Sequence, residues 1–274
     1  MELRNGETSI HPTAVVDPRA QIDPGVEIGP YAVVGPDVSI GAGTRIAPHV
    51  VLDGRVTMGR GNRVFPGACI GAEPQDLKYS GAATEVVIGD DNAIRECVTI
   101  NRATHDGEQT RIGNSNLLMA YSHLGHNCLL GDRIVIANGV AVAGHVVIGD
   151  RAIIGGVLGI HQFVHIGTMA MVGGMSRIDR DVPPYAIVEG HPGRLRGLNR
   201  IGIKRSGLAE LDGGAQAKQL QQVWAELYRT DAVLAEAIQL VRQQQLLPPA
   251  ETLVSFLEAS IAPGRRGPLP AGRS

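Results

Sequence analysis

The chain repeats an aliphatic position every six residues over most of its length. Stepping by six from Ile10 to Ile178 visits 29 positions, and 26 of them carry Ile, Val, Leu or Met. The three exceptions are Asp76, Ala82 and Asp106. An α-helix repeats a face every ~3.6 residues and a flat strand every ~2, so neither explains this period. A six-residue unit instead fits a short strand followed by a sharp turn.

Three such units would form an 18-residue coil with a triangular cross-section and the aliphatic side chains pointing inward. Successive coils would then stack as parallel strands, about 4.8 Å apart. Aromatic residues are only 3% of the chain, which suits a narrow interior filled by Ile, Val, Leu and Ala. We therefore predict an all-β parallel β-helix, a triangular prism built from hexapeptide repeats. The period does not fix its hand, and parallel crossovers are usually right-handed.

Two segments interrupt the repeat, 72–84 and 102–111, and the phase of six resumes after each. Both must therefore protrude without disturbing the stacking. The first carries Gln75, Asp76 and Lys78, which favours a lid or arm over a merely tolerated surface loop.

The repeat stops after Pro183–Pro184, and the rest of the chain has helical periodicity. We expect a first helix with one apolar stripe, a second helix capped by Asp231 and broken by Pro248–Pro249, and a short third helix. The stripes consist of Leu220, Val223, Trp224 and Leu227, then Leu234, Ile238 and Val241, then Leu253, Phe256 and Leu257. The expected domains are a β-helix over 1–190, a small C-terminal α-helical domain over 191–262 and a disordered tail over 263–274.

Charge and cysteine content exclude several classes of protein. The formal net charge is −2, which argues against nucleic-acid binding. Cys69, Cys97 and Cys128 lack the spacing of a zinc site, and a reducing compartment fits them best. No apolar run reaches ~18 residues, so we expect a cytoplasmic protein with no stable membrane insertion.

Because a coil has 18 residues, residues spaced by 18 should lie at the same edge of the prism in successive coils. His126, Gly144 and Gln162 are spaced by 18, and His145 and His161 flank them by one residue. His123 lies three residues before His126. Imidazoles gathered there could act as a general base toward a hydroxyl, or three of them could bind zinc and activate water.

Several stretches resemble the UDP-N-acetylglucosamine O-acyltransferase family, whose members catalyse the first step of lipid A biosynthesis. They are QDLKY at 75–79, IRECVTINR at 94–102, NLLMAYSHLGHNC at 116–128, AGHVVIGD at 143–150, HQF at 161–163 and DVPPY at 181–185. The resemblance implies a left-handed β-helix and a homotrimer with its active site between subunits. It also implies transfer of a fatty acyl group, expected to be 3-hydroxyacyl, from acyl carrier protein to the sugar's 3-hydroxyl.

The resemblance also assigns roles. His126 matches the general base and the Gly144 N–H the oxyanion donor, with direct transfer and no acyl-enzyme, cofactor or metal. The sugar nucleotide and pantetheine would contact Gln75, Asp76, Lys78, His123, His145, His161, Gln162, Asn199 and Arg205. Gly174 matches the position that limits acyl length, with Met171 and Met175 beside it.

The sequence departs from the family in places. Asn127 follows the base where the family commonly has Asp; an amide can fix the tautomer but supplies no full charge. Ile201 and Ser206 replace two residues near the nucleotide. The basic segment 194–205 would be either a solvated face or a docking patch for acidic acyl carrier protein. Two other functions stay open: a zinc hydratase of the hexapeptide carbonic anhydrase type, using His123, His126 and His145, and a non-enzymatic scaffold.

Overall fold

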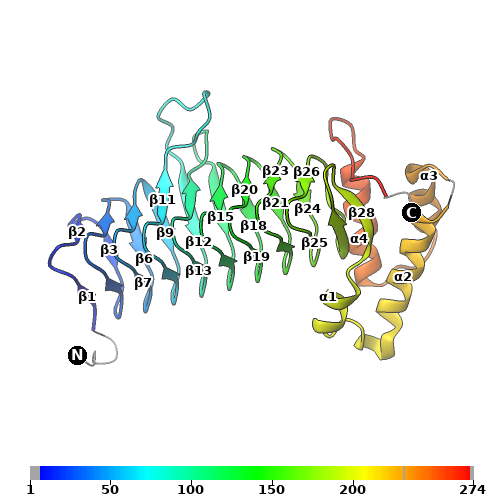
Figure 1. Ribbon diagram of the computed structural model, residues 1–274, viewed down its shortest axis with the longest axis horizontal. Helices are drawn as coiled ribbons and strands as arrows, with labels where there is room; N and C mark the ends of the chain where they lie inside the picture. Colours follow the sequence, from blue (N-terminus) through cyan, green and yellow to red (C-terminus); the bar gives the residue numbers. More distant parts are fainter. Residues whose placement is uncertain (1–6, 231, 272–274) are drawn as a thin grey trace.

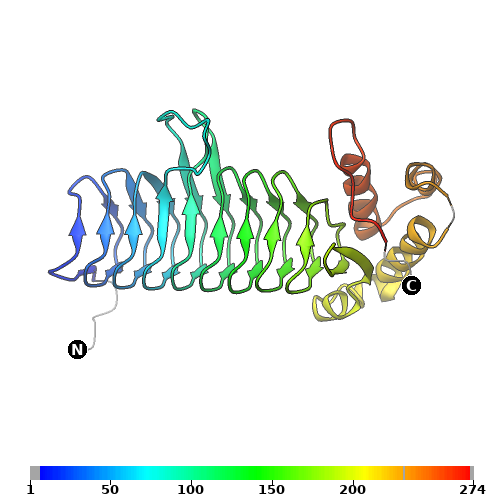
Figure 2. The ribbon, with the colours of Figure 1, turned by 45° about the horizontal axis from the view of Figure 1, so that its top comes forward.

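A computed structural model describes residues 7–230 and 232–271. Short strands form the three sides of a long prism, and a group of helices packs at its C-terminal end (Figures 1 and 2). Within the described residues no helix is both long and apolar enough to cross a bilayer.

Each side of the prism is one sheet, which we call A, B or C. Sheet A consists of β1 (Ser9–Ile10), β4 (Glu27–Ile28), β7 (Arg45–Ile46), β10 (Arg63–Val64), β13 (Ala93–Ile94), β16 (Leu117–Leu118), β19 (Val135–Ile136), β22 (Ile153–Ile154), β25 (Met171–Val172), β27 (Ala186–Glu189) and β28 (Arg194–Leu198). Sheet B consists of β2 (Val15–Val16), β5 (Val33–Val34), β8 (Val51–Leu52), β11 (Cys69–Ala72), β14 (Thr99–Asn101), β17 (His123–Leu124), β20 (Ala141–Val142), β23 (Gly159–Ile160) and β26 (Arg177–Ile178). Sheet C consists of β3 (Gln21–Ile22), β6 (Val38–Ile40), β9 (Arg55–Met58), β12 (Glu85–Ile88), β15 (Gln109–Ile112), β18 (Leu129–Leu130), β21 (Val147–Ile148) and β24 (His165–Ile166).

The register of the strands confirms the predicted coil. Ile10 pairs with Ile28, an offset of 18 residues. Val64 pairs with Ile94, an offset of 30, and Ile94 pairs with Leu118, an offset of 24. The two interruptions therefore add 12 and 6 residues (30 − 18 and 24 − 18), both multiples of six. This is why the hydrophobic phase survives each of them.

The repeated aliphatic side chains fill the interior of the prism. Ile40, Leu52, Ile70, Ile100 and Ile136 are all at most 1% exposed. Burying each such side chain contributes about 1.5–3 kcal/mol. The core is therefore a continuous aliphatic column that holds the coils in register.

Two loops project together from the prism and are joined by hydrogen bonds (Figure 1). The first follows β11 and ends at β12; the second occupies residues 102–108, shorter than expected because 109–112 form β15. The Ala83 N–H donates to Asp106 Oδ1 (2.7 Å), and the Arg102 guanidinium donates to the Tyr79 hydroxyl (2.8 Å). Each loop thus braces the other above one corner of the prism.

The C-terminal region begins with strand rather than helix. β27 and β28 pair antiparallel, and the helical part starts only at Arg200. Its elements are α1 (Arg200–Arg205), the 3₁₀ helix η1 (Leu211–Gly214), α2 (Ala215–Tyr228), α3 (Leu234–Val241) and α4 (Pro248–Ser260). The first predicted stripe is confirmed, since Leu220, Val223, Trp224 and Leu227 are buried in α2. Pro248 and Pro249 begin α4, where proline's missing N–H costs nothing, and the predicted Asp231 cap lies outside the described residues.

The prediction of a disordered tail over 263–274 is wrong for residues 263–271. Pro268 bridges to Asp181, and Ala271 bridges to Leu195. Leu269 is 1% exposed, and Arg265 pairs with the buried Asp181 at 2.6 Å. A buried ion pair and an apolar anchor thus order a segment whose Pro, Gly and Arg content suggested disorder. Residues 272–274 lie outside the described part.

Candidate functional site

A pocket of ≈ 550 Å³ lies beneath the two loops, at the corner between sheets B and C. Its lining consists of Gln75, Asp76, Leu77, Lys78, Asn101, His123, Gly125, His126, Ala143, Gly144 and Gln162. Three successive coils supply His126, Gly144 and Gln162, as their 18-residue spacing predicts. The first loop supplies Gln75, Asp76 and Lys78, so it covers the column of residues at the corner.

A chain of hydrogen bonds orients the imidazole of His126, which is 8% exposed. Its Nδ1 lies 2.9 Å from Thr104 Oγ1 and 2.9 Å from Asn127 Oδ1. The Asn127 amide donates through Nδ2 to Glu108 Oε2 at 2.7 Å. An ionised carboxylate only accepts, so Glu108 turns the amide oxygen of Asn127 toward His126. That oxygen accepts the Nδ1–H and leaves the Nε2 lone pair facing the pocket.

Glu108 is charged in this arrangement. Burial opposes ionisation, but hydrogen bonds from the Asn127 side chain and the His105 N–H outweigh it and lower the pKa of Glu108. A charged carboxylate therefore lies one hydrogen bond beyond Asn127, although the residue next to His126 is itself an amide. The amide of Asn127 connects the two.

Gly144 lies directly under the His126 ring. An ideal Cβ on Gly144 would overlap the imidazole, with Nε2 the nearest atom, so any larger residue would displace the ring. The same column in the first two coils holds Pro18 and Pro36, which have no N–H, so the stacking of regular coils does not require this donor. No acceptor for the Gly144 N–H occurs in the described ranges 7–230 and 232–271. The donor is free to bind a developing negative charge.

Asp76 reaches the Nε2 side of the His126 imidazole from the first loop. Its Oδ2 lies 3.7 Å from His126 Nε2, and its Oδ1 accepts the Lys78 N–H at 3.0 Å. That backbone hydrogen bond, together with the nearby His126, lowers the pKa of Asp76 although partial burial opposes ionisation. An acceptor therefore stands where the hydroxyl of a substrate would approach the Nε2 lone pair.

The surroundings of His123 and His145 favour the neutral form of both imidazoles. His123 Nδ1 lies 2.8 Å from Thr99 Oγ1, while the His145 ring stands perpendicular to that of His126 at 5.0 Å and stacks on Phe163 at 4.8 Å. Burial, followed by the proximity of His126, lowers the pKa of both His123 and His145. Across the part of the chain that the structure describes, no three His, Cys, Asp or Glu side chains are placed to share a metal ion.

Comparison with known proteins decides the family. The model of UDP-N-acetylglucosamine O-acyltransferase domain 2 matches residues 181–268, and that of the bacterial transferase hexapeptide matches 109–144. The O-acyltransferase of Anaeromyxobacter dehalogenans is 47% identical over 254 residues, covering 92% of this chain and 97% of its own. That of Gloeothece citriformis is 53% identical over 205 residues, covering 74% and 73%. The chain belongs to the UDP-N-acetylglucosamine O-acyltransferase family.

Solved structures of this O-acyltransferase family agree. LpxA from Acinetobacter baumannii superposes with a TM-score of 0.88 at 40% identity, covering 95% of this chain and 99% of that one. The enzyme from Francisella novicida also gives a TM-score of 0.88, at 35% identity, covering 96% and 95%. The left-handed β-helix expected from the resemblance is confirmed.

The remaining residues expected from the O-acyltransferase family lie elsewhere in the chain. Asn199, Arg205 and Met171 line a second hollow of ≈ 710 Å³ on sheet A, as do Ile201 and Ser206. In a triangular prism, sheet A is the side opposite the corner between B and C. A single chain therefore carries the two groups of expected residues on opposite sides.

Asn199 has a structural task in that hollow. Its Oδ1 accepts the Gly202 N–H at 2.9 Å as the N-cap of α1, and its Nδ2 donates to the Met169 carbonyl at 2.9 Å. Asn199 is also only 6% exposed. The capping hydrogen bonds of Asn199 fix the start of α1 at the hollow. Arg205 is the last residue of α1 and also lines the hollow.

His161, Gly174 and Met175 do not line the His126 pocket. His161 is exposed, and its Nδ1 lies 3.1 Å from the Gln162 carbonyl oxygen. Gly174 and Met175 stand at the corner between sheets A and B, where Met175 is 76% exposed. Their expected roles stay predictions.

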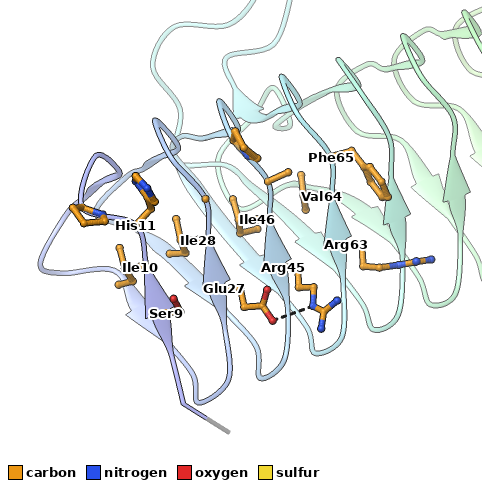
Figure 3. A pocket seen from close by; sticks show the side chains of 14 residues that line it. Ser9, Ile10, His11, Glu27, Ile28, Arg45, Ile46, Arg63, Val64 and Phe65 are labelled. Carbon is orange, nitrogen blue, oxygen red and sulfur yellow. Dashed lines mark ion pairs between the residues drawn. The ribbon is translucent and has the colours of Figure 1, made fainter. Parts of the chain in front are cut away.

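A further hollow covers the N-terminal coils of sheet A (Figure 3). Its floor is Ile10, Ile28, Ile46 and Val64, and an ion pair joins Arg45 to Glu27 at 3.2 Å. Its lining contains one imidazole, that of His11, and none of the loop residues that cover the His126 pocket.

Three polar residues of the site were not expected from the sequence. Thr104 orients His126 directly and Glu108 does so through Asn127, but both belong to a loop outside the hexad phase, so spacing could not place them. Asn101 is 5% exposed and lines the pocket; its Nδ2 donates to the Glu73 carbonyl at 2.8 Å. Its Oδ1 has no partner in the described part of the chain, so a substrate hydroxyl could donate to it.

Proposed function

We propose that this protein transfers a 3-hydroxyacyl group from acyl carrier protein to the 3-hydroxyl of UDP-N-acetylglucosamine, the first step of lipid A biosynthesis. One observation carries the chemistry: the Nε2 lone pair of His126 and the unused N–H of Gly144 meet in a single pocket. Family membership supplies the two substrates, because the relatives are named for acyl-[acyl-carrier-protein] and UDP-N-acetylglucosamine.

In the proposed mechanism, His126 Nε2 accepts the proton of the sugar's 3-hydroxyl as that oxygen attacks the thioester carbonyl. The carbonyl oxygen becomes an oxyanion, which accepts a hydrogen bond from the Gly144 N–H; such a donor is worth a factor of about 100–1000 in rate. The imidazolium is stabilised through Asn127 by the charge of Glu108. Collapse of the intermediate breaks the carbon–sulfur bond, and the leaving thiolate takes the proton from His126.

No acyl-enzyme is required because both substrates are held together. The nearest cysteine also makes a poor nucleophile. Cys128 is 0% exposed, and burial raises the pKa of its thiol to about 12. The thiolate that would attack a thioester is therefore scarce at neutral pH.

The placement of Arg205 and Met171 in the hollow on sheet A, away from the His126 corner, supports a homotrimeric enzyme, which we place in the cytoplasm. A site that needs both the His126 corner and the sheet A hollow can be completed only by a second copy of the chain. In this arrangement the nucleotide reaches Arg205 of a neighbour. The acyl chain runs along the groove between subunits, with Gly174, Met171 and Met175 setting its length.

Mass spectrometry of the reaction product tests this function. The purified protein is incubated with UDP-N-acetylglucosamine, its 3-amino analogue and a mixture of acyl carrier protein thioesters of different length and 3-hydroxylation. We expect one acylated sugar nucleotide whose ester lies at the 3-oxygen. Absence of any acylated product, or preference for the amino analogue, would contradict the proposal.

A further inference from the structure

A small basic hollow of ≈ 290 Å³ lies next to the site, on its C-terminal side. Gln162 and Phe163 form one wall, and Arg180 lies on the next coil. The remaining wall comes from the C-terminal tail, through Arg265 and Arg266. The hollow thus adjoins the column that contains the base.

A buried carboxylate fixes the tail in this place. Asp181 is 4% exposed and accepts two hydrogen bonds from Arg265 Nη2, at 2.7 and 2.6 Å. It also accepts one from the Ser260 hydroxyl at 2.7 Å and one from the His165 N–H at 2.8 Å. The Arg180 guanidinium donates to the carbonyl of Arg266, which ties the tail to the coil a second time.

The charges of the hollow do not cancel. Arg265 neutralises Asp181, and Asp179 pairs with Arg177 at 3.4 Å. Within the described ranges, neither Arg180 nor Arg266 forms an ion pair with a carboxylate. Two guanidinium groups are therefore left to bind an anion, and phosphate oxygens match their donor geometry.

The distance along the prism fits the phosphate of a pantetheine arm. Arg180 follows Gly144 by 36 residues, or two coils, which is about 10 Å at the spacing of parallel strands. A pantetheine arm spans about 16 Å from its sulfur to its phosphorus when extended, from ordinary bond lengths. An arm whose thioester sits at Gly144 therefore reaches Arg180 with slack.

We infer that Arg180 and Arg266 bind the phosphodiester of the phosphopantetheine group on acyl carrier protein. The inference rests on the proposed function and extends it by one binding site. The arm runs from the oxyanion donor past Gln162, and its phosphate sits between the next coil and the clamped tail. This site is distinct from the basic segment 194–205, which would contact the carrier protein itself.

Two small thioesters test the inference without the carrier protein. S-(3-hydroxyacyl)-4′-phosphopantetheine and its dephosphorylated pantetheine counterpart are compared by kcat/KM with UDP-N-acetylglucosamine and by calorimetric binding. Wild type should prefer the phosphorylated form by about tenfold, as expected for partly exposed charge-assisted bonds. The variant R180Q/R266Q should lose that preference while keeping its kcat on the dephosphorylated form. R19Q, at the opposite end of the prism, is the matched control and should keep it.

Equal binding of both thioesters by wild type would overturn the inference, as would an unchanged preference in R180Q/R266Q. The two proposals can fail separately. If neither thioester is turned over, the proposed reaction is contradicted. The phosphate site is still supported in that case if wild type binds the phosphorylated thioester more tightly and R180Q/R266Q abolishes this difference. An unchanged urea unfolding midpoint in R180Q/R266Q would show that the lost preference is not a loss of structure.

Discussion

The Asn127 amide donates to the Glu108 carboxylate at 2.7 Å and presents its oxygen to His126 Nδ1 at 2.9 Å. Asn127 belongs to the β-helix corner, whereas Glu108 is the last residue of the second loop. A charge supplied by a loop thus takes the place of an acidic side chain next to His126. The importance of the hydrogen bond between Glu108 and Asn127 can be tested by exchanging the carboxylate and the amide between the two positions.

Each single exchange should impair catalysis. Glu108→Gln removes the charge and lets the amide of residue 127 flip, whereas Asn127→Asp puts two carboxylates in contact. A charge-assisted hydrogen bond is worth about 1.5–3 kcal/mol, so we expect kcat to fall about tenfold or more in each variant. The double variant E108Q/N127D restores one carboxylate and one donor, and its kcat should return to within about threefold of wild type. Multiplicative losses in the double variant would contradict the relay.

Gly144 is predicted to tolerate no side chain. In Gly144→Ala the new methyl group would occupy the place of the His126 ring, and kcat should fall by a factor of at least ~100. The control is Gly159→Ala on the neighbouring coil, where an added Cβ meets no atom within 4 Å. Steady-state acyl transfer by the two variants checks this. Comparable kcat values for both would show that the space beneath the imidazole is not needed.

His165 should make the fold less stable in mild acid. Burial, followed by the adjacent Arg265, lowers the pKa of His165, whose Nε2 lies 3.1 Å from Arg265 Nη1. The unfolded chain binds this proton at about pH 6.5, above the folded value, so its contribution to stability is complete above that pH and is lost as pH falls. Urea unfolding at pH 7.5 and 5 should show a smaller loss of free energy in His165→Gln than in wild type. An equal or larger loss in the variant would exclude this role.

The regular part of the site was predictable because the hexad period turns sequence distance into spatial distance. His126, Gly144 and Gln162 share a corner for that reason. Glu108 was not predictable, since the path of its loop depends on bracing such as the bond between Ala83 and Asp106.

The C-terminal tail escaped prediction for a different reason. Its order depends on one buried acid, Asp181, more than eighty residues away in sequence from Arg265. The amino-acid composition of the tail does not indicate that such a distant partner exists. The position of Arg205 could not be predicted either, because the side of the prism on which it lies depends on how the three sheets are assembled.

The central claim is that His126 is the general base, and the rate of acyl transfer by His126→Ala tests it most directly. The variant is compared with wild type and with His11→Ala, an exposed histidine on the first coil, using hydroxyacyl carrier protein and UDP-N-acetylglucosamine. We predict that kcat falls by a factor of about 10²–10⁴ in His126→Ala and stays unchanged in His11→Ala. A His126→Ala enzyme that is folded and keeps more than about a tenth of the wild-type kcat would contradict the account.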